Sequence, residues 1–377
     1  MARTLKSDKM LFWSTLLLVG LSLLMVYSST AVLSVNKGLA PYHVLVRQAV
    51  WVVLGLSLLL GAMRVDYHNL RRPALIWTLL AITTLALVGT FFSPVRASTQ
   101  RWLSYGQFSV QPSEFAKLVA VMFTAALLER RMHRVNDVKY ALMPILIVTG
   151  VFAGLIILEP DFGTAAMLVL VVGVVVFAAG LSYRHVLTSV AVLVPTAVAV
   201  IFAADYRSQR LLAFFDSSDQ TGANYQMFQS LIAVGSGGAF GKGLMDGVQK
   251  VGYLPEAHND FIYAVIGEEL GLVGATAVLV CFVVIAWRGY RASLLAPDRF
   301  GSLLAMGITS MVALQALINI TVILGLLPTK GIPLPFVSNG GSSLVTNMLA
   351  MGILLNISQQ TSSGAVLAIG SDETEHE

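Results

Sequence analysis

The stretch Leu11-Phe-Trp-Ser-Thr-Leu-Leu-Leu-Val-Gly-Leu-Ser-Leu-Leu-Met-Val-Tyr-Ser-Ser-Thr-Ala-Val-Leu33 decides the fold of this chain, because it contains no charged side chain. An α-helix of roughly 20 apolar residues crosses the hydrocarbon core of a bilayer. Arg3, Lys6 and Lys9 precede the stretch, as they would in a signal peptide. We nevertheless expect it to remain as a membrane anchor, because it is long and further apolar runs follow.

Nine more apolar runs of similar length follow the first one. The ten runs lie at about 11–33, 44–63, 74–92, 113–129, 140–158, 162–182, 186–204, 261–287, 301–326 and 338–358. The 377 residues are 56% hydrophobic and 12% charged, with a mean hydropathy of +0.78. A water-soluble protein cannot bury this much apolar surface. The sequence therefore predicts an all-α polytopic membrane protein with about ten transmembrane helices in a single domain, residues 1–358.

Basic residues are distributed unevenly between the two sides of this membrane domain. If the amino terminus is inside, the inner connections hold fourteen of the 24 lysines and arginines. The short outer loops hold Lys37, Arg47, Arg96, Arg101 and Lys330. Because positive charge accumulates on the cytoplasmic side, both termini are predicted to be cytoplasmic. Topology thus explains the isoelectric point of about 9.2, and no nucleic-acid partner is expected. The polar segment 359–377 is predicted to be a disordered cytoplasmic tail.

One large extracytoplasmic loop, residues about 205–260, connects the seventh and eighth runs. It contains six of the twenty acidic residues, four basic residues and one of the six histidines. Long loops in compact proteins are usually functional or disordered, and the tyrosine, phenylalanine and glycine content here favours order. The glycine-rich centre is not a nucleotide-binding loop, because Gly243 follows Lys242 where serine or threonine is required. Lys242 and Lys250 could instead reach anionic headgroups or phosphates.

The loop ends in a cluster of ionisable residues, Glu256, His258 and Asp260. A carboxylate at the entrance to the membrane can act as a general base if desolvation raises its pKa, and Asp260 is best placed for this role. Metal binding is only weakly indicated by the spacing. The residues alone leave three interpretations open: catalysis, coupling of ions or protons in a transporter, and a structural helix start.

Two other groups of charged residues lie at the outer ends of apolar runs. Glu114 and Lys117 are three residues apart, so they share one helical face. They form either a mutual salt bridge or a polar wall of a cavity, and ionisable groups in membrane spans often mark function. The segment Glu159-Pro-Asp161-Phe-Gly163 is either an ordinary turn or a second polar wall.

Two further segments are predicted to lie on the outer side. Residues 100–113 form an amphipathic stretch suited to the outer surface, and Ser113 could cap the fourth helix. The segment Gly331-Ile-Pro-Leu-Pro-Phe-Val-Ser-Asn-Gly-Gly-Ser-Ser343 cannot form one regular helix, because of its prolines and glycines. We expect a broken or re-entrant segment that presents Ser338, Ser342 and Ser343 to an outside cavity.

Together these motifs resemble the SEDS family (shape, elongation, division and sporulation proteins). The matching segments occur in family order: Arg101-Trp102, Gln111-Pro-Ser-Glu-Phe-Ala-Lys117, Glu159-Pro-Asp-Phe-Gly-Thr-Ala165, Leu231-Ile-Ala-Val-Gly-Ser-Gly-Gly238, Tyr253-Leu-Pro-Glu-Ala-His-Asn-Asp-Phe261, Ile266-Gly-Glu-Glu-Leu-Gly271, Pro333-Leu-Pro-Phe336 and Gly340-Gly-Ser-Ser343. Gln249-Lys250 and Pro328-Thr-Lys-Gly331 are more similar to the division branch than to the elongation branch. Asn259 and Asn339 depart from the family's usual threonine and tyrosine.

This resemblance implies a peptidoglycan glycosyltransferase that polymerises lipid II at the outer face of the bacterial cytoplasmic membrane, at the division septum. Asp260 would be the essential carboxylate, and undecaprenyl diphosphate would leave with inversion at the anomeric carbon. Positive charge would stabilise that leaving group. The implied residues for binding substrate and diphosphate are Lys117 first, then Glu114, Asp161, Arg101, Lys242, Lys250, Glu256, His258, Ser342 and Ser343.

The resemblance also implies partners. These are a class B penicillin-binding protein transpeptidase, other divisome membrane proteins and membrane lipids. A divalent cation, Mg²⁺ or Mn²⁺, could bridge Asp260 and the diphosphate, although no set of ligands in the sequence requires one. A lipid flippase and a non-catalytic scaffold remain as alternatives. A flippase would spread its charges through the membrane midplane, whereas Glu114, Lys117, Asp161 and Asp260 are predicted near the outer ends of helices.

Overall fold

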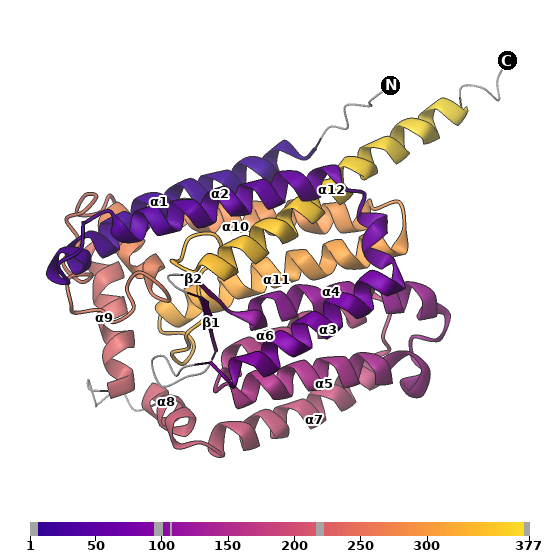
Figure 1. The fold of residues 1–377 in the computed structure, drawn as a ribbon, viewed down its shortest axis with the longest axis horizontal. Coiled ribbons are helices and arrows are strands. Elements are labelled where there is room, and N and C mark those ends of the chain that lie inside the picture. Colours follow the sequence, from indigo (N-terminus) through magenta and orange to yellow (C-terminus); the bar gives the residue numbers. More distant parts are fainter. Residues whose placement is uncertain (1–6, 94–100, 106–107, 216–221, 373–377) are drawn as a thin grey trace.

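The computed structural model describes residues 7–93, 101–105, 108–215 and 222–372, and helices dominate it (Figure 1). The ten long helices are α1 (Lys9–Asn36), α2 (His43–Arg64), α3 (Pro73–Thr90), α4 (Pro112–Arg131), α5 (Met143–Leu158), α6 (Phe162–Ala178), α7 (Tyr183–Phe202), α10 (Ile262–Leu294), α11 (Arg299–Ile323) and α12 (Gly341–Asp372). Each coincides with one predicted apolar run. The shorter helical elements are η1 (Tyr67–Arg71), η2 (Met132–Arg134), η3 (Val138–Leu142), α8 (Asp205–Phe215) and α9 (Gly222–Ser236).

The helical lengths and compositions confirm an all-α polytopic membrane protein. Within the described ranges, eight helical segments are long and apolar enough to cross a membrane. Helix α6 is apolar but has 17 residues, and α4 carries Glu114 and Lys117 in addition to charges in its last turn. The total of ten spans therefore stays a prediction.

The long helices lie side by side, and α11 and α12 form much of the buried interior (Figure 1). Helix α12 packs closely against α2, because glycine removes the side chain at their contact. A Cβ atom on Gly352 would lie 2.5 Å from the carbonyl oxygen of Leu59, and small residues allow such close approach between membrane helices. Helix α7, in contrast, has no buried residue, so it presents its apolar side chains outward.

The two ends of the bundle differ in content. One end carries the turn between α1 and α2, helix α9 and the strands, while α1 begins and α12 ends at the other (Figure 1). This arrangement agrees with the prediction that both termini lie on the same side. The backbone of α12 continues as helix to Asp372, into the segment from 359 that we expected to be a disordered tail. Residues 373–377 of that tail lie outside the described part of the chain.

The structure shows two unpredicted strands before α4 and corrects one expectation there, the cap at Ser113. Residues of this segment form an antiparallel pair, β1 (Leu103–Tyr105) and β2 (Phe108–Val110), with Leu103 opposite Val110. Apolar and polar residues alternate in each strand, as expected for a half-buried strand. Ser113 does not cap α4, because the helix already begins at Pro112 and proline is favoured in the first turn.

The large loop packs against the first half of α10. Helix α10 is interrupted at Gly271, whose φ of 66° and ψ of −164° are non-helical. The amide nitrogens of Lys242 and Gly243 donate to the carbonyl oxygens of Glu268 (3.0 Å) and Glu269 (3.1 Å). A Cβ atom on Gly237 would lie 1.9 Å from the carbonyl oxygen of Gly267, so this backbone contact requires glycine. The loop is thus held by α10, as its composition suggested.

Candidate active site

Asp260 lies in the last turn of the large loop, immediately before α10, and its side chain is partly buried. The Asn319 side-chain amide of α11 donates to the backbone oxygens of Asp260 (2.7 Å) and Ile332 (2.8 Å). Within the described residues, the Asp260 carboxylate itself has no hydrogen bond or ion pair. A Cβ atom on Gly331 would lie 2.9 Å from Asp260 Oδ2. Gly331 therefore packs close to the carboxylate, and any side chain at this position would crowd it.

The surroundings of Asp260 raise its pKa to about 7. Burial is the largest cause, and the negative charges of Glu256 and Asp161 act in the same direction, while Arg101 and Arg210 oppose them. A carboxylate that titrates near neutral pH is well matched to accept a proton from a substrate hydroxyl at that pH. This geometry and pKa suit a general base.

Hydrogen bonds tie the irregular segment before α12 to the Asp260 turn. The Asn339 amide nitrogen donates to the carbonyl oxygen of His258 (3.1 Å). The Ser338 hydroxyl donates to the carbonyl oxygen of Asn259 (2.6 Å) and accepts from the Leu334 amide nitrogen (2.8 Å). These bonds satisfy backbone groups of a non-helical segment. Such groups need partners within the protein where no bulk water is available.

Three serines of this segment are buried rather than presented to an outside cavity, which corrects our expectation. Ser338, Ser342 and Ser343 are 4%, 1% and 7% exposed. Ser338 is used in the hydrogen bonds above, and Ser343 accepts from the Asn347 side chain (2.8 Å to its carbonyl oxygen). The reason is that α12 begins at Gly341, so Ser342 and Ser343 belong to its packed first turn.

A buried polar network links α4 to the same segment. Lys117 Nζ donates to Glu114 Oε1 (3.0 Å) and to Gln315 Oε1 (2.7 Å), and Gln315 Nε2 donates to the carbonyl oxygen of Pro333 (2.9 Å). The salt bridge that we considered from the spacing is therefore present. Through Gln315 of α11, the network also reaches Pro333, in the irregular segment beside Asp260. Lys117 therefore holds that segment in place.

Asp161 is both a helix cap and part of a polar cluster. Its carboxylate accepts from the Thr164 amide nitrogen (3.1 Å), the Thr164 hydroxyl (2.8 Å) and Gln111 Nε2 (3.1 Å). Arg101 Nη1 lies 3.4 Å from Asp161 Oδ2. Nearby, Glu159 accepts from the Thr90 hydroxyl (2.7 Å), and burial raises the pKa of Glu159 to about 7. The segment 159–163 is thus both an ordinary turn that begins a helix and a polar wall, so the two interpretations given for it are compatible.

Lys242 and Lys250 pair with two buried acids of α10. Lys242 Nζ lies 2.8 Å from Glu268 Oε1, and 35% of the Lys242 side chain stays exposed. Lys250 Nζ forms an ion pair with Glu269 and donates to the Ser28 hydroxyl (2.8 Å). Lys250 is buried by these contacts, which corrects the expectation that it reaches outward. Diphosphate binding by the two lysines stays a prediction.

Sequence reasoning missed Gln315 and Asn319, which connect the Lys117 network and the Asp260 turn. Both amides are buried, at 0% and 2% exposure. The signal was available, because two polar residues four apart in an apolar run share one helical face. Lys330 was noted as an outer basic residue and as part of the Pro328-Thr-Lys-Gly331 motif, but not as a site residue. Its ammonium lies 4.7 Å from the centre of the Phe162 ring, and burial lowers its pKa.

Within the described ranges, no three His, Cys, Asp or Glu side chains group closely enough to hold a metal ion. Mg²⁺ commonly takes only one or two protein carboxylates and completes its shell with water and substrate phosphates. The unpaired Asp260 carboxylate is compatible with such a shared site. The divalent cation therefore stays a prediction.

The fold and this site define a class: a multi-pass membrane protein with an acid and cation cluster at one end of its helix bundle. Residues 9–363 match the FtsW, RodA and SpoVE family, described as "Cell cycle protein". The chain belongs to this family, which is the SEDS family that the motifs indicated.

Two relatives illustrate the similarity in sequence. The "Probable peptidoglycan glycosyltransferase FtsW" of Geobacter metallireducens is 38% identical over 338 residues, which is 89% of this chain and 90% of the relative. The "Stage V sporulation protein E" of Bacillus subtilis is 39% identical over 357 residues, which is 93% of this chain and 97% of the relative. The likeness to FtsW confirms the similarity to the division branch.

Two solved structures share the fold. A chain of the structure "Structural coordination of polymerization and crosslinking by a peptidoglycan synthase complex" is 28% identical with a TM-score of 0.77, and 95% of this chain and 99% of that chain are covered. RodA of Thermus thermophilus is 26% identical with a TM-score of 0.68, and the coverage is 95% and 98%.

Proposed function

We propose that this protein polymerises lipid II into glycan strands at the outer face of the cytoplasmic membrane, for septal cell-wall synthesis. The names of the FtsW relatives support the activity and the division role. The observation that carries the proposal is the Asp260 carboxylate: it lies at the entrance to α10, has a pKa raised to about 7, and faces Gly331 without a hydrogen-bond partner among the described residues.

In the proposed reaction, Asp260 accepts the proton of the 4-hydroxyl of the acceptor's N-acetylglucosamine. The hydroxyl oxygen attacks the anomeric carbon of the donor's muramyl sugar, and a new C–O bond forms with inversion. The bond from that carbon to the diphosphate breaks, and undecaprenyl diphosphate leaves with the electron pair. Arg101 acts electrostatically on Asp260 and is the first candidate to stabilise the growing negative charge on the leaving group.

Lys117 has a different role from the one that the resemblance implied. Its ammonium is 3% exposed and already bonded to Glu114 and Gln315, so it holds the segment near Asp260 in place. If a divalent cation takes part, Asp260 and the substrate diphosphate would be its ligands, and the cation would neutralise charge on the diphosphate.

A transpeptidase partner follows from the same comparison. The similar chain with a TM-score of 0.77 comes from a peptidoglycan synthase complex, and polymerisation needs cross-linking to build a wall. We propose a class B penicillin-binding protein as that partner, together with other divisome membrane proteins.

A labelled lipid II assay tests the function. The purified protein, alone and with its transpeptidase partner, is incubated with labelled lipid II, and glycan length is measured. Asp260→Asn keeps the side-chain volume but removes the base, so we expect no detectable polymer. Asp66→Asn, on a carboxylate at the opposite end, is the matched control and should polymerise normally. A wild-type complex that makes no glycan, as a scaffold or a flippase would behave, overturns the proposal; so does full activity of Asp260→Asn.

A further inference from the structure

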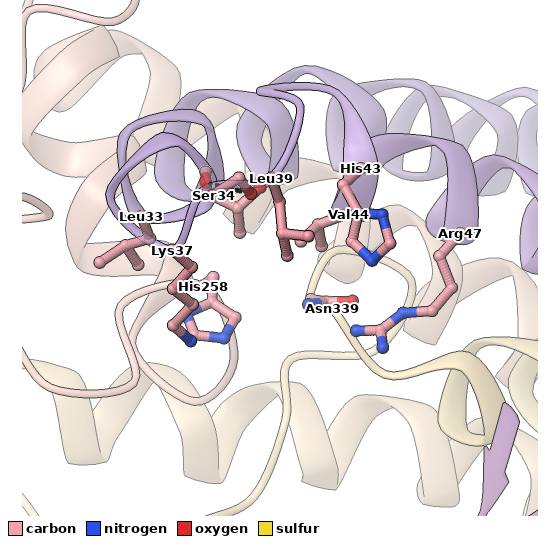
Figure 2. A pocket seen from close by; sticks show the side chains of 10 residues that line it. Leu33, Ser34, Lys37, Leu39, His43, Val44, Arg47, His258 and Asn339 are labelled. Atoms are coloured by element: carbon pink, nitrogen blue, oxygen red, sulfur yellow. Dashed lines mark hydrogen bonds between the residues drawn. The ribbon is translucent and has the colours of Figure 1, made fainter. Parts of the chain in front are cut away.

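A cavity of about 240 Å³ lies between the turn that joins α1 to α2 and the Asp260 loop. Its polar lining comes from three places: α1 and the residue after it contribute Thr30, Ser34 and Lys37, the start of α2 contributes His43 and Arg47, and His258 and Asn339 lie across from them (Figure 2). Figure 2 shows Lys37 beside His258, and Arg47 beside Asn339. The catalytic proposal above uses none of the residues on α1 and α2.

Among the described residues, Lys37 and Arg47 line the cavity and no acidic side chain does. Among the described residues, neither Lys37 nor Arg47 forms an ion pair or a side-chain hydrogen bond. His258 Nδ1 is buried and has no hydrogen-bond partner there. Burial lowers the pKa of His258, and Lys37 and Arg47 act in the same direction, against Glu256. An anion in this cavity would therefore compensate two charges and supply an acceptor for the buried ring nitrogen.

The start of helix α2 adds to this preference for an anion. The helix begins at His43, and its N-cap residue, Tyr42, makes no side-chain capping bond. Unsatisfied amide groups and the helix dipole make such a terminus electropositive. His43 and Val44, from this first turn, line the cavity. Side-chain charge and backbone dipole thus point to the same class of ligand.

The cations beside the cavity differ from those that act on Asp260. Arg101 and Arg210 act on Asp260, whereas Lys37 and Arg47 act on His258, and Glu256 acts on both residues. His258 lies two residues before Asp260, and its carbonyl oxygen accepts from the Asn339 amide nitrogen (3.1 Å). The loop end therefore has two cationic neighbourhoods.

We propose that the cavity lined by Lys37, Arg47 and His258 binds the diphosphate of the acceptor substrate, while the neighbourhood of Arg101 binds that of the donor. This inference rests on the proposed function, because a polymerase that joins two lipid-linked sugars holds two diphosphates at once. Two such anions repel each other, so each needs its own cations. An anionic phospholipid headgroup shares the phosphate chemistry, and the experiment separates the two sources.

Binding stoichiometry provides the test. The full chain is placed in nanodiscs of zwitterionic lipid, and farnesyl diphosphate is titrated calorimetrically, with empty nanodiscs subtracted. We expect two equivalents for the wild type and one for the double variant K37Q/R47Q, whose second site weakens by about ten-fold or more because two charge-assisted contacts are lost. The matched control, K9Q/R72Q, removes the same charge at the other end of the bundle and should still bind two. Two equivalents for K37Q/R47Q, or one for the wild type, overturn the proposal.

Two further measurements fix the source and the role of the site. In nanodiscs that contain phosphatidylglycerol, the wild type should still bind two equivalents of farnesyl diphosphate. If the anionic lipid displaces one of them, the cavity is a general headgroup site and the acceptor assignment is overturned. In glycan synthesis, K37Q/R47Q should raise the lipid II concentration for half-maximal rate about ten-fold, whereas Arg101→Gln should lower the maximal rate. A lowered maximal rate without that rise for K37Q/R47Q also overturns the assignment.

The binding and synthesis results separate this proposal from the function on which it rests. If the wild type makes no glycan but its stoichiometry changes from two to one in K37Q/R47Q, the polymerase function fails and the phosphate site stands. If glycan is made and K37Q/R47Q binds two equivalents, only the site fails.

Discussion

The Asp260 end of the bundle and the opposite end both carry clusters of charged residues, but their charges are used differently. At the opposite end, Asp298 accepts from the Tyr67 hydroxyl and lies 3.8 Å from Arg71 Nη1, and Arg71 is also paired with Glu129 (2.6 Å). Burial and the hydrogen bond to Asp298 raise the pKa of Tyr67. Each of these groups has a protein partner.

At the Asp260 end, four groups have no hydrogen-bond or ion-pair partner among the described residues. They are the Asp260 carboxylate, the cations Lys37 and Arg47, and the buried His258 Nδ1. A buried polar group without a partner lowers the free energy of unfolding. Such groups are therefore rare, and they are kept mainly at functional sites. The state of pairing, rather than the presence of charge, therefore separates the candidate active site from the structural cluster.

Removing the unpaired acid should have the largest effect. Asp260→Asn is expected to reduce the rate of glycan synthesis by about 10²- to 10⁴-fold, the range for loss of a general base. The melting temperature should not fall, because the raised pKa means that the native fold already disfavours the charged carboxylate. Single-turnover rates and thermal unfolding in the same detergent check both parts. A large loss of stability would instead make Asp260 a structural residue.

The pH dependence of synthesis should follow the same carboxylate. Because the pKa of Asp260 is raised to about 7, the base is protonated and inactive below that pH. The rate should therefore rise about ten-fold per pH unit well below 7 and level off above it. Rates from pH 5 to 9, with stability measured at each pH, provide the check. A rate that is flat between pH 5 and 7 contradicts this role.

Breaking the buried Lys117 network should mainly affect stability. Lys117→Met leaves Glu114 buried without its cation, which costs about 3 to 5 kcal/mol in comparable buried pairs. The free energy of unfolding should recover partly in the double variant Lys117→Met, Glu114→Gln, which removes both charges. Denaturant unfolding of the three proteins gives the coupling. Equal stability of the wild type and Lys117→Met would mean that the network is not formed.

The bridging amide on α11 should give a smaller effect on both properties. Asn319→Ala leaves the carbonyl oxygens of Asp260 and Ile332 without their donor, which costs about 1 to 3 kcal/mol. Because Asp260 then loses a positional restraint, the maximal rate should fall without a change in the pH midpoint. Asn319→Asp lacks the donor and should not restore the rate, whereas Asn319→Gln should restore part of it.

The paired cluster should give the smallest effect on activity. Asp298→Ala removes the N-cap of α11 and the contacts to Tyr67 and Arg71. We expect a stability loss of about 1 to 2 kcal/mol and an unchanged rate per folded molecule. Thermal unfolding and active-site titration make the comparison. A rate that falls as much as in Asn319→Ala would remove the difference between the two ends.

Much of the fold was readable from the sequence, because membrane burial acts on local composition. All ten apolar runs became helices, and the irregular segment at Gly331–Gly340 followed from its prolines and glycines. The helix starts that carry Glu114, Lys117 and Asp161 were also predictable, because these acids and this cation stand at the ends of apolar runs. The strands Leu103–Tyr105 and Phe108–Val110 were missed although their alternation was visible in the residues.

The partners of individual charges could not be predicted, because they depend on contacts between distant segments. Lys250 was expected to reach outward, but the loop turns back and places it on Glu269. The direction in which the loop turns is set by the close contact of Gly237 with Gly267 and not by any local sequence pattern. The group of Lys37, Arg47 and His258 was hidden for the same reason, since His258 is more than 200 residues away from Lys37 and Arg47 in the chain.

The contact between Ser28 and Glu269 has a consequence for the order in which the protein is made. The Ser28 hydroxyl lies 2.7 Å from Glu269 Oε1 although 241 positions separate the two residues in sequence. Helix α1 emerges from the ribosome first, and its hydroxyl must remain in the membrane until α10 is synthesised. The segment at 331–340 that holds the Asp260 turn arrives later still. The reactive end is therefore assembled near the end of translation, so an unfinished chain has no complete site.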